Sequence, residues 1–96
     1  MIELTDETFE QETSTGTVVV DFYAQWCGIC KALAPKVEEI AKHNPKYKFC
    51  KADVEKCPEI AKKLGIVNLP TFVMYNDGVM VGKGGFDIII KIEGEK

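Results

Sequence analysis

Two cysteines separated by two residues are the part of this sequence best suited to chemistry. Cys27 and Cys30 follow a β-branched and aromatic run at residues 17–23 and open a segment whose apolar residues have helical spacing. A cysteine at the start of a helix faces unpaired backbone N–H groups and the positive end of the helix dipole. Both favour the thiolate, so we expect the pKa of Cys27 to be lowered and Cys27 to act as a nucleophile at neutral pH.

Cys30 lies about one helical turn after Cys27 on the same helix face, close enough to form a disulfide with it. The pair predicts dithiol–disulfide exchange. Cys27, expected to be the more exposed of the two, attacks a substrate disulfide, and Cys30 then attacks the Cys27 sulfur and releases the reduced substrate. A lone C-x-x-C pair is also half of a zinc site, but its place between a strand and a helix favours the redox interpretation.

Asp21 is the second candidate, because it lies inside the apolar run that precedes the cysteines. Burial of a carboxylate there is costly and raises its pKa. Such a carboxyl near a dithiol can accept the Cys30 proton and return it, as a general base and acid. The alternative is an aspartate at a strand end that bonds to backbone, but a position six residues before Cys27 favours the catalytic role.

The remaining cysteines do not complete a metal site. Cys50 lies in a strand interior and is expected to be a small buried residue, whereas Cys57 precedes Pro58 near a helix start and is expected to be exposed and somewhat acidic, as a bystander or a regulatory thiol. Their spacing does not match the paired C-x₂₋₄-C units of zinc sites, and we expect neither a metal nor a Cys50–Cys57 bridge. His43 is interpreted as a helix-end residue.

The rest of the pattern alternates strands and helices. Strands are expected at residues 2–4, 17–23, 47–54, 71–75 and 79–83. A first helix is expected to follow an N-cap at Thr5 or Asp6 and to end at about residue 12. Further helices are expected at 27–43, with a kink at Pro35, at 58–64 and at 87–93. The motif Asn76-Asp77-Gly78 predicts a hairpin turn. This order predicts one α/β domain over residues 1–96, a three-layer α/β/α sandwich with a mixed sheet of about five strands and about four helices.

Net charge and the distribution of apolar residues indicate which kinds of partner this protein can have. The formal net charge of −3 argues against nucleic acid and anionic membrane surfaces as main partners. No apolar run approaches the roughly 20 residues of a membrane span, and the acidic N-terminal segment does not look like a signal or transit peptide. We therefore expect a soluble, cytoplasmic protein. Nothing in the sequence indicates a small-molecule cofactor.

Residues 21–31, DFYAQWCGICK, resemble the active-site segment of thioredoxins. The resemblance continues at Pro35, Lys51, Asp53, Gly65, the run Leu69-Pro70-Thr71-Phe72, the turn Asn76-Asp77-Gly78, and Gly85. It covers nearly the whole chain and implies the thioredoxin fold and the reduction of protein disulfides. It also implies a monomer that an NADPH-dependent thioredoxin reductase recharges.

The resemblance assigns roles at matching positions. Pro70 would be a cis-proline that faces the disulfide, and Leu69 would offer its backbone to an extended substrate peptide. Lys51 would place its amine near Asp21 and tune it, although a solvated strand residue is the alternative. The substrate surface implied around Cys27 comprises Trp26, Gly28, Ile29, Ile66, Val67, Asn68, Leu69, Pro70 and Gly85. For Trp26, plain packing is the alternative.

The chain departs from the family pattern at Ile29, where thioredoxins usually carry proline. Proline donates no N–H, so Ile29 restores a backbone donor near the Cys27 sulfur and should make the protein more oxidising. This leaves open a role like that of disulfide isomerases or oxidases. Against that role, Ile29 is not the histidine typical of isomerase domains, and no signal peptide is seen. A redox-inert scaffold is disfavoured because both cysteines are present together with Asp21 and Pro70.

Overall fold

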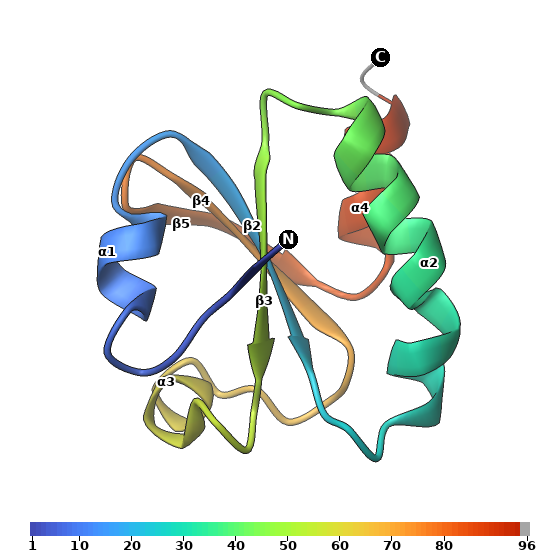
Figure 1. Ribbon diagram of the computed structural model, residues 1–96. Coiled ribbons are helices and arrows are strands. Elements are labelled where there is room, and N and C mark those ends of the chain that lie inside the picture. Colours follow the sequence, from blue (N-terminus) through green and yellow to red (C-terminus); the bar gives the residue numbers. More distant parts are fainter. Residues whose placement is uncertain (95–96) are drawn as a thin grey trace.

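A five-stranded mixed sheet forms the centre of the computed structural model, which describes residues 1–94 (Figure 1). Its strands are β1 (Ile2–Glu3), β2 (Thr17–Tyr23), β3 (Lys48–Asp53), β4 (Thr71–Asn76) and β5 (Val79–Gly84). They lie in the order β1-β3-β2-β4-β5. β3 is parallel to both of its neighbours, whereas β4 is antiparallel to β2 and β5. The predicted mixed sheet is confirmed.

Four helices cover the sheet from both sides. They are α1 (Phe9–Thr13), α2 (Gly28–His43), α3 (Pro58–Lys63) and α4 (Asp87–Gly94). α1 and α3 lie on one face and α2 and α4 on the other (Figure 1). The predicted three-layer sandwich is therefore confirmed, and α2 continues through Pro35 to His43.

Two buried clusters hold the layers together, and β2 contributes to both. Val18, Val20 and Phe22 pack toward α1 and α3, in one cluster with Phe9. Val19 packs on the opposite face with residues of α2 and α4. Because side chains alternate along a strand, Asp21 points to the same face as Val19. This double coverage explains why β2 is almost continuously apolar, and it directs the Asp21 carboxyl toward α2.

The hairpin between β4 and β5 forms at the predicted turn. Asp77 and Gly78 have positive φ angles of 49° and 84°, the conformation that two-residue hairpin loops require and that aspartate and glycine tolerate best. The Asp77 carboxylate also accepts the backbone N–H of Gly16 at 2.8 Å, which ties the turn to the start of β2.

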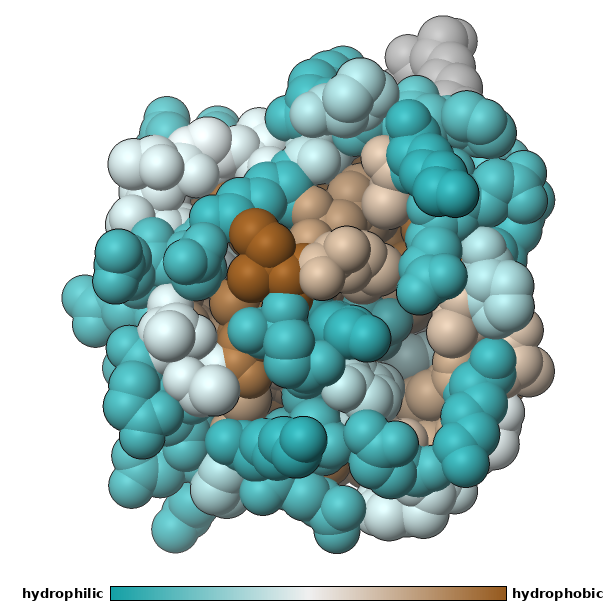
Figure 2. All heavy atoms as spheres, in the orientation of Figure 1, coloured by the Kyte–Doolittle hydropathy of each residue, from teal (hydrophilic) through white to brown (hydrophobic). Residues whose placement is uncertain are grey.

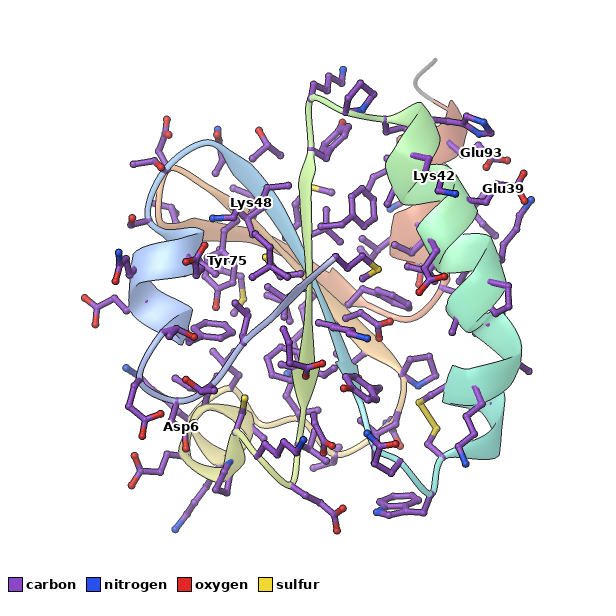
Figure 3. All side chains as sticks on the ribbon, viewed as in Figure 1. Asp6, Glu39, Lys42, Lys48, Tyr75 and Glu93 are labelled. Carbon is purple, nitrogen blue, oxygen red and sulfur yellow. A yellow bond between two sulfur atoms is a disulfide. The ribbon has the colours of Figure 1, made fainter. Side chains whose placement is uncertain are left out.

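The first helix was predicted to start too early. α1 begins at Phe9 rather than near Thr5 or Asp6, whereas the other element boundaries lie within one residue of those predicted. Asp6 accepts the backbone N–H groups of Glu59 at 3.3 Å and Ile60 at 3.1 Å. It therefore caps α3, a helix distant in sequence, and Figure 3 shows the labelled Asp6 beside that helix.

The surface is mainly polar on the face shown in Figure 2, with an apolar patch near the N-terminus. Met1 and Ile2 are among the exposed apolar residues, at 44% and 43%. Within residues 1–94 no helix has the length and apolar character needed to cross a membrane.

Asp6→Ala should lower the free energy of unfolding by about 1 kcal/mol, because two N–H groups at the start of α3 lose their acceptor. Urea denaturation measures the change. Glu7→Ala removes the neighbouring exposed carboxyl and should change stability by less than about 0.5 kcal/mol. Equal losses in the two variants would contradict the capping role of Asp6.

Candidate active site

A disulfide between Cys27 and Cys30 lies at the N-terminal end of α2 (Figure 3). Cys27 is the residue before the first helical turn, and its backbone is extended, with φ −82° and ψ 105°. The Cα atoms of the pair are 5.3 Å apart, within the usual disulfide range. The backbone N–H of Cys30 donates to the Cys27 Sγ at 3.2 Å, so the sulfur itself caps the helix. The position predicted to favour a thiolate is thus the position observed.

The prediction that Cys27 is the more exposed cysteine is wrong. Cys27 is 6% exposed and Cys30 is 8% exposed. Both belong to a small apolar cluster that includes Ala24 and is covered in part by Leu69. Because the Cys27 sulfur caps the start of α2, it lies among these apolar groups. The neighbouring Trp26 is 69% exposed. A substrate must therefore approach along the surface beside Cys27.

That surface is a groove of about 340 Å³. Its lining residues are Trp26, Cys27, Val54, Ile66, Val67, Asn68 and Leu69. The Leu69–Pro70 peptide bond next to the groove is cis, the isomer that the family resemblance implies.

The groove differs from the predicted substrate surface in its membership. Gly28, Ile29, Pro70 and Gly85 are not among its lining residues, although Ile29 is 58% exposed. Val54 lines the groove and was missed from the sequence. The order of predicted strands could have indicated it. Val54 directly follows β3, which is parallel to β2, so it lies at the same edge of the sheet as the active-site loop.

A second pocket, of about 130 Å³, lies between the sheet and α2. Asp21, Lys51 and Cys30 are among its lining residues. Within the described part of the chain, the Oδ1 atom of Asp21 has no hydrogen-bond partner. The pocket is lined mainly by apolar groups, but with the Asp21 carboxyl and the Lys51 ammonium in its wall it is large enough to hold a water molecule. The carboxyl of β2 and the sulfur of α2 thus share one small space through which a proton can pass.

Burial raises the pKa of the Asp21 carboxyl to about 6. The positive charge of Lys51 lowers this pKa and the negative charge of Glu3 raises it, each by less than burial does. Proton acceptors and donors work best when their pKa lies near the working pH. Asp21 therefore has the proton affinity that the predicted acid–base role requires.

Lys51 lies next to Asp21 and is held by other groups as well. The two residues are direct partners in the register of β2 and β3, and Glu3 is the partner of Lys51 on β1. The Lys51 Nζ is 3.8 Å from a Glu3 carboxylate oxygen and 5.8 Å from the centre of the Tyr23 ring. The Tyr23 hydroxyl donates to the Glu3 carboxylate at 2.9 Å. Glu3 and Tyr23 were missed from the sequence, where only a predicted strand register would have indicated them.

The two other cysteines are buried free thiols. The prediction for Cys57 is therefore wrong. It is fully buried, its S–H donates to the backbone carbonyl of Leu4 at 3.2 Å, and burial raises its pKa to about 11. Burial also raises the pKa of Cys50 to about 11. Across residues 1–94, no group of three or more histidine, cysteine or acidic side chains is arranged to hold a metal ion.

These features define a class of protein: an α/β dithiol–disulfide exchange protein with its redox pair at a helix N-terminus. The comparisons with known proteins agree. The thioredoxin family model matches residues 1–86. The chain is 45% identical over 80 residues to a thioredoxin of Listeria monocytogenes, covering 82% of this chain and 78% of that protein. It is 42% identical over 82 residues to a thioredoxin of Bacillus subtilis, covering 84% and 79%.

A solved structure shows the same likeness in three dimensions. A thioredoxin of Plasmodium falciparum superposes with a TM-score of 0.89 at 36% identity, covering all of both chains. The chain belongs to the thioredoxin family. It is a protein-disulfide oxidoreductase whose redox centre is Cys27 and Cys30.

Asp21→Asn should stabilise the oxidised protein at neutral pH. The folded chain holds the Asp21 proton more tightly than the unfolded chain, so wild-type stability falls as pH rises from 3.8, the ordinary pKa, to about 6. Asparagine does not ionise. Its advantage should be absent below pH 3.8 and reach about 3 kcal/mol above pH 6.

Urea denaturation at acid and neutral pH measures this difference. Glu10→Gln, which removes an exposed carboxyl of α1, is the matched control and should change stability little at either pH. An Asp21→Asn gain of the same size at both pH values would show that the cost is not one of ionisation.

Proposed function

We propose that Cys27 is the nucleophile, Cys30 the resolving thiol and Asp21 the proton acceptor in the reduction of protein disulfides. The observation that carries this assignment is the hydrogen bond from the Cys30 N–H to the Cys27 Sγ at the start of α2. It supports the assignment because a sulfur at a helix start is stabilised as a thiolate, and because the Cys30 sulfur is bonded to that sulfur in the oxidised form.

The reaction balances with these groups alone. The Cys27 thiolate attacks one sulfur of the substrate disulfide, the substrate S–S bond breaks, and the first substrate thiolate leaves. The Cys30 thiol passes its proton to the Asp21 carboxylate through the pocket that both line. The Cys30 thiolate then attacks the Cys27 sulfur and releases the second substrate thiolate. Two electrons have moved from the dithiol to the substrate, and the pair is left as a disulfide.

The groove beside Cys27 supports binding of an extended substrate segment. Trp26 and Val67 present apolar surface to solvent, at 69% and 86% exposure. Leu69 is one of the groove-lining residues, and it is followed in the chain by cis Pro70 and β4. We expect its backbone to pair with a substrate peptide in the manner of an added strand, and the exposed Trp26 and Val67 to contact the peptide side chains. Such binding depends on the substrate backbone more than on its side chains. A protein that binds in this way can reduce substrates of different sequence.

We further propose that an NADPH-dependent thioredoxin reductase returns the electrons and that the protein works as a monomer in the cytoplasm. The disulfide product must be reduced before another cycle, and family membership supports a reductase as the source. Cys50 and Cys57 are free thiols, as is usual in reducing compartments.

Cys27→Ser should abolish the acceleration of insulin reduction by dithiothreitol. Cys30→Ser should abolish turnover too, but it should accumulate a mixed disulfide with insulin, since the nucleophile remains and the resolving thiol is gone. Cys57→Ala, which changes a buried cysteine away from the groove, is the control and should retain activity. Turnover by Cys27→Ser would refute the assignment.

Ile29→Pro should lower the reduction potential by about 30 mV, because it removes a backbone N–H near the Cys27 thiolate and such a donor is worth roughly 1.4 kcal/mol. Ile29 is the second residue of α2 and supplies a backbone N–H that proline lacks. Equilibration with glutathione measures the potential. Ile29→Ala keeps the N–H and should match the wild type. The idea fails if Ile29→Pro has an equal or higher potential.

A further inference from the structure

One cation lies between two carboxylates on three neighbouring strands. Glu3 on β1 is the register partner of Lys51 on β3, and Lys51 is the register partner of Asp21 on β2. All three strands are parallel, so directly paired side chains lie on the same face of the sheet. The Lys51 ammonium therefore lies between the Glu3 and Asp21 carboxylates, and contact with one draws it away from the other.

Lys51 pairs with Glu3 and not with Asp21. A Glu3 oxygen lies 3.8 Å from the Lys51 Nζ, and both Glu3 oxygens lie 2.9 Å from the Tyr23 hydroxyl. Among residues 1–94, Lys51 makes no ion pair with Asp21, and the Asp21 Oδ1 lacks a hydrogen-bond partner. The cation is thus drawn toward the sheet edge, while the more buried carboxyl remains unpaired.

Tyr23 fixes this arrangement. It lies two residues after Asp21 on the same face of β2, and its hydroxyl reaches Glu3 on β1, across the strand that carries Lys51. The Lys51 Nζ lies 5.8 Å from the centre of the Tyr23 ring. The tyrosine therefore holds the Glu3 carboxylate in place and lies beside the lysine.

We propose that Glu3 is a positioning residue for the proton transfer at Asp21: it holds the Lys51 ammonium away from the Asp21 carboxyl. This proposal rests on the role given to Asp21 in the proposed function. A lysine in direct contact would favour the ionised carboxylate and weaken its hold on the proton. With Lys51 held by Glu3, Asp21 keeps a proton affinity suited to exchange with Cys30 near neutral pH.

Other groups line the same pocket as Asp21. They are Tyr23 on β2, the N-terminal residue Met1, and Cys30, Lys31 and Glu38 on α2. The β4 register partner of Asp21 is the apolar Phe72. Glu38 is the useful comparison, because it is an acidic residue of this pocket for which the structure shows no ion pair with Lys51.

The test is the titration of the Asp21 carboxyl carbon by NMR in the oxidised protein. In Glu3→Gln, Lys51 is released toward Asp21, and the Asp21 midpoint should fall by about one pH unit below the wild-type value. Glu38→Gln removes a negative charge from the same pocket and should lower the midpoint by less.

The decisive comparison repeats both substitutions in a Lys51→Met background. Glu3→Gln should then lose most of its effect, because there is no lysine left to reposition, whereas Glu38→Gln should keep its effect. The proposal is overturned if Glu3→Gln does not lower the midpoint, or if it lowers it equally with and without Lys51. Glu3 and Lys51 are each 40% exposed, so these variants should fold.

Failure of the proposed function is detected separately. The pH profile of insulin reduction should lose its acid limb near pH 6 in Asp21→Asn, and that limb should move to lower pH in Glu3→Gln. An unchanged profile in Asp21→Asn would remove Asp21 from the reaction. The NMR titrations would still decide whether Glu3 controls the position of Lys51.

Discussion

The chemistry of this protein depends on one contact, in which the Cys27 sulfur takes the place of an N-cap side chain and accepts the Cys30 N–H. The contact exists because β2 ends at Tyr23 and α2 begins at Gly28, so the chain turns at the cysteine. The side chains of β2 are buried on both faces of the sheet, and this packing fixes the end of β2 from which the turn begins. The sheet therefore determines where the helix starts, and the helix start determines which sulfur is reactive.

The same sheet carries a carboxyl that is costly to bury. Asp21 occupies a position on β2 where an apolar residue would give a more stable fold, and burial raises its pKa to about 6. Natural proteins keep such costs at functional sites. Its unpaired oxygen, the pocket shared with Cys30 and the lysine held by Glu3 form one arrangement. Asp21 lowers the stability of the fold, and in the proposed reaction its unpaired carboxyl exchanges a proton with Cys30 rather than forming a buried ion pair with Lys51.

Most of the fold follows from local signals in the sequence. The apolar run of β2, the helical spacing after Cys27 and the Asp77-Gly78 turn each determine their own element. The errors arise where a residue acts on a distant segment. Asp6 looks like a cap for the helix that follows it but caps α3, and Cys57 looks exposed at a helix start but is covered by the segment around Leu4. Glu3 lies near the Asp21 pocket because it is the register partner of Lys51, and Val54 lines the groove because β3 runs parallel to β2. Both placements depend on how strands pair, which a local sequence pattern does not show.

The most direct test of the account is the ionisation of Cys27 in the reduced Cys30→Ser variant, followed by the ultraviolet absorbance of the thiolate as pH is raised. Cys50 and Cys57 do not interfere, since burial raises the pKa of each to about 11. The account predicts that the Cys27 pKa lies at least about one unit below the value of about 8.5 for free cysteine. A value at or above that of free cysteine would contradict it, because the helix start would then give no stabilisation to the sulfur.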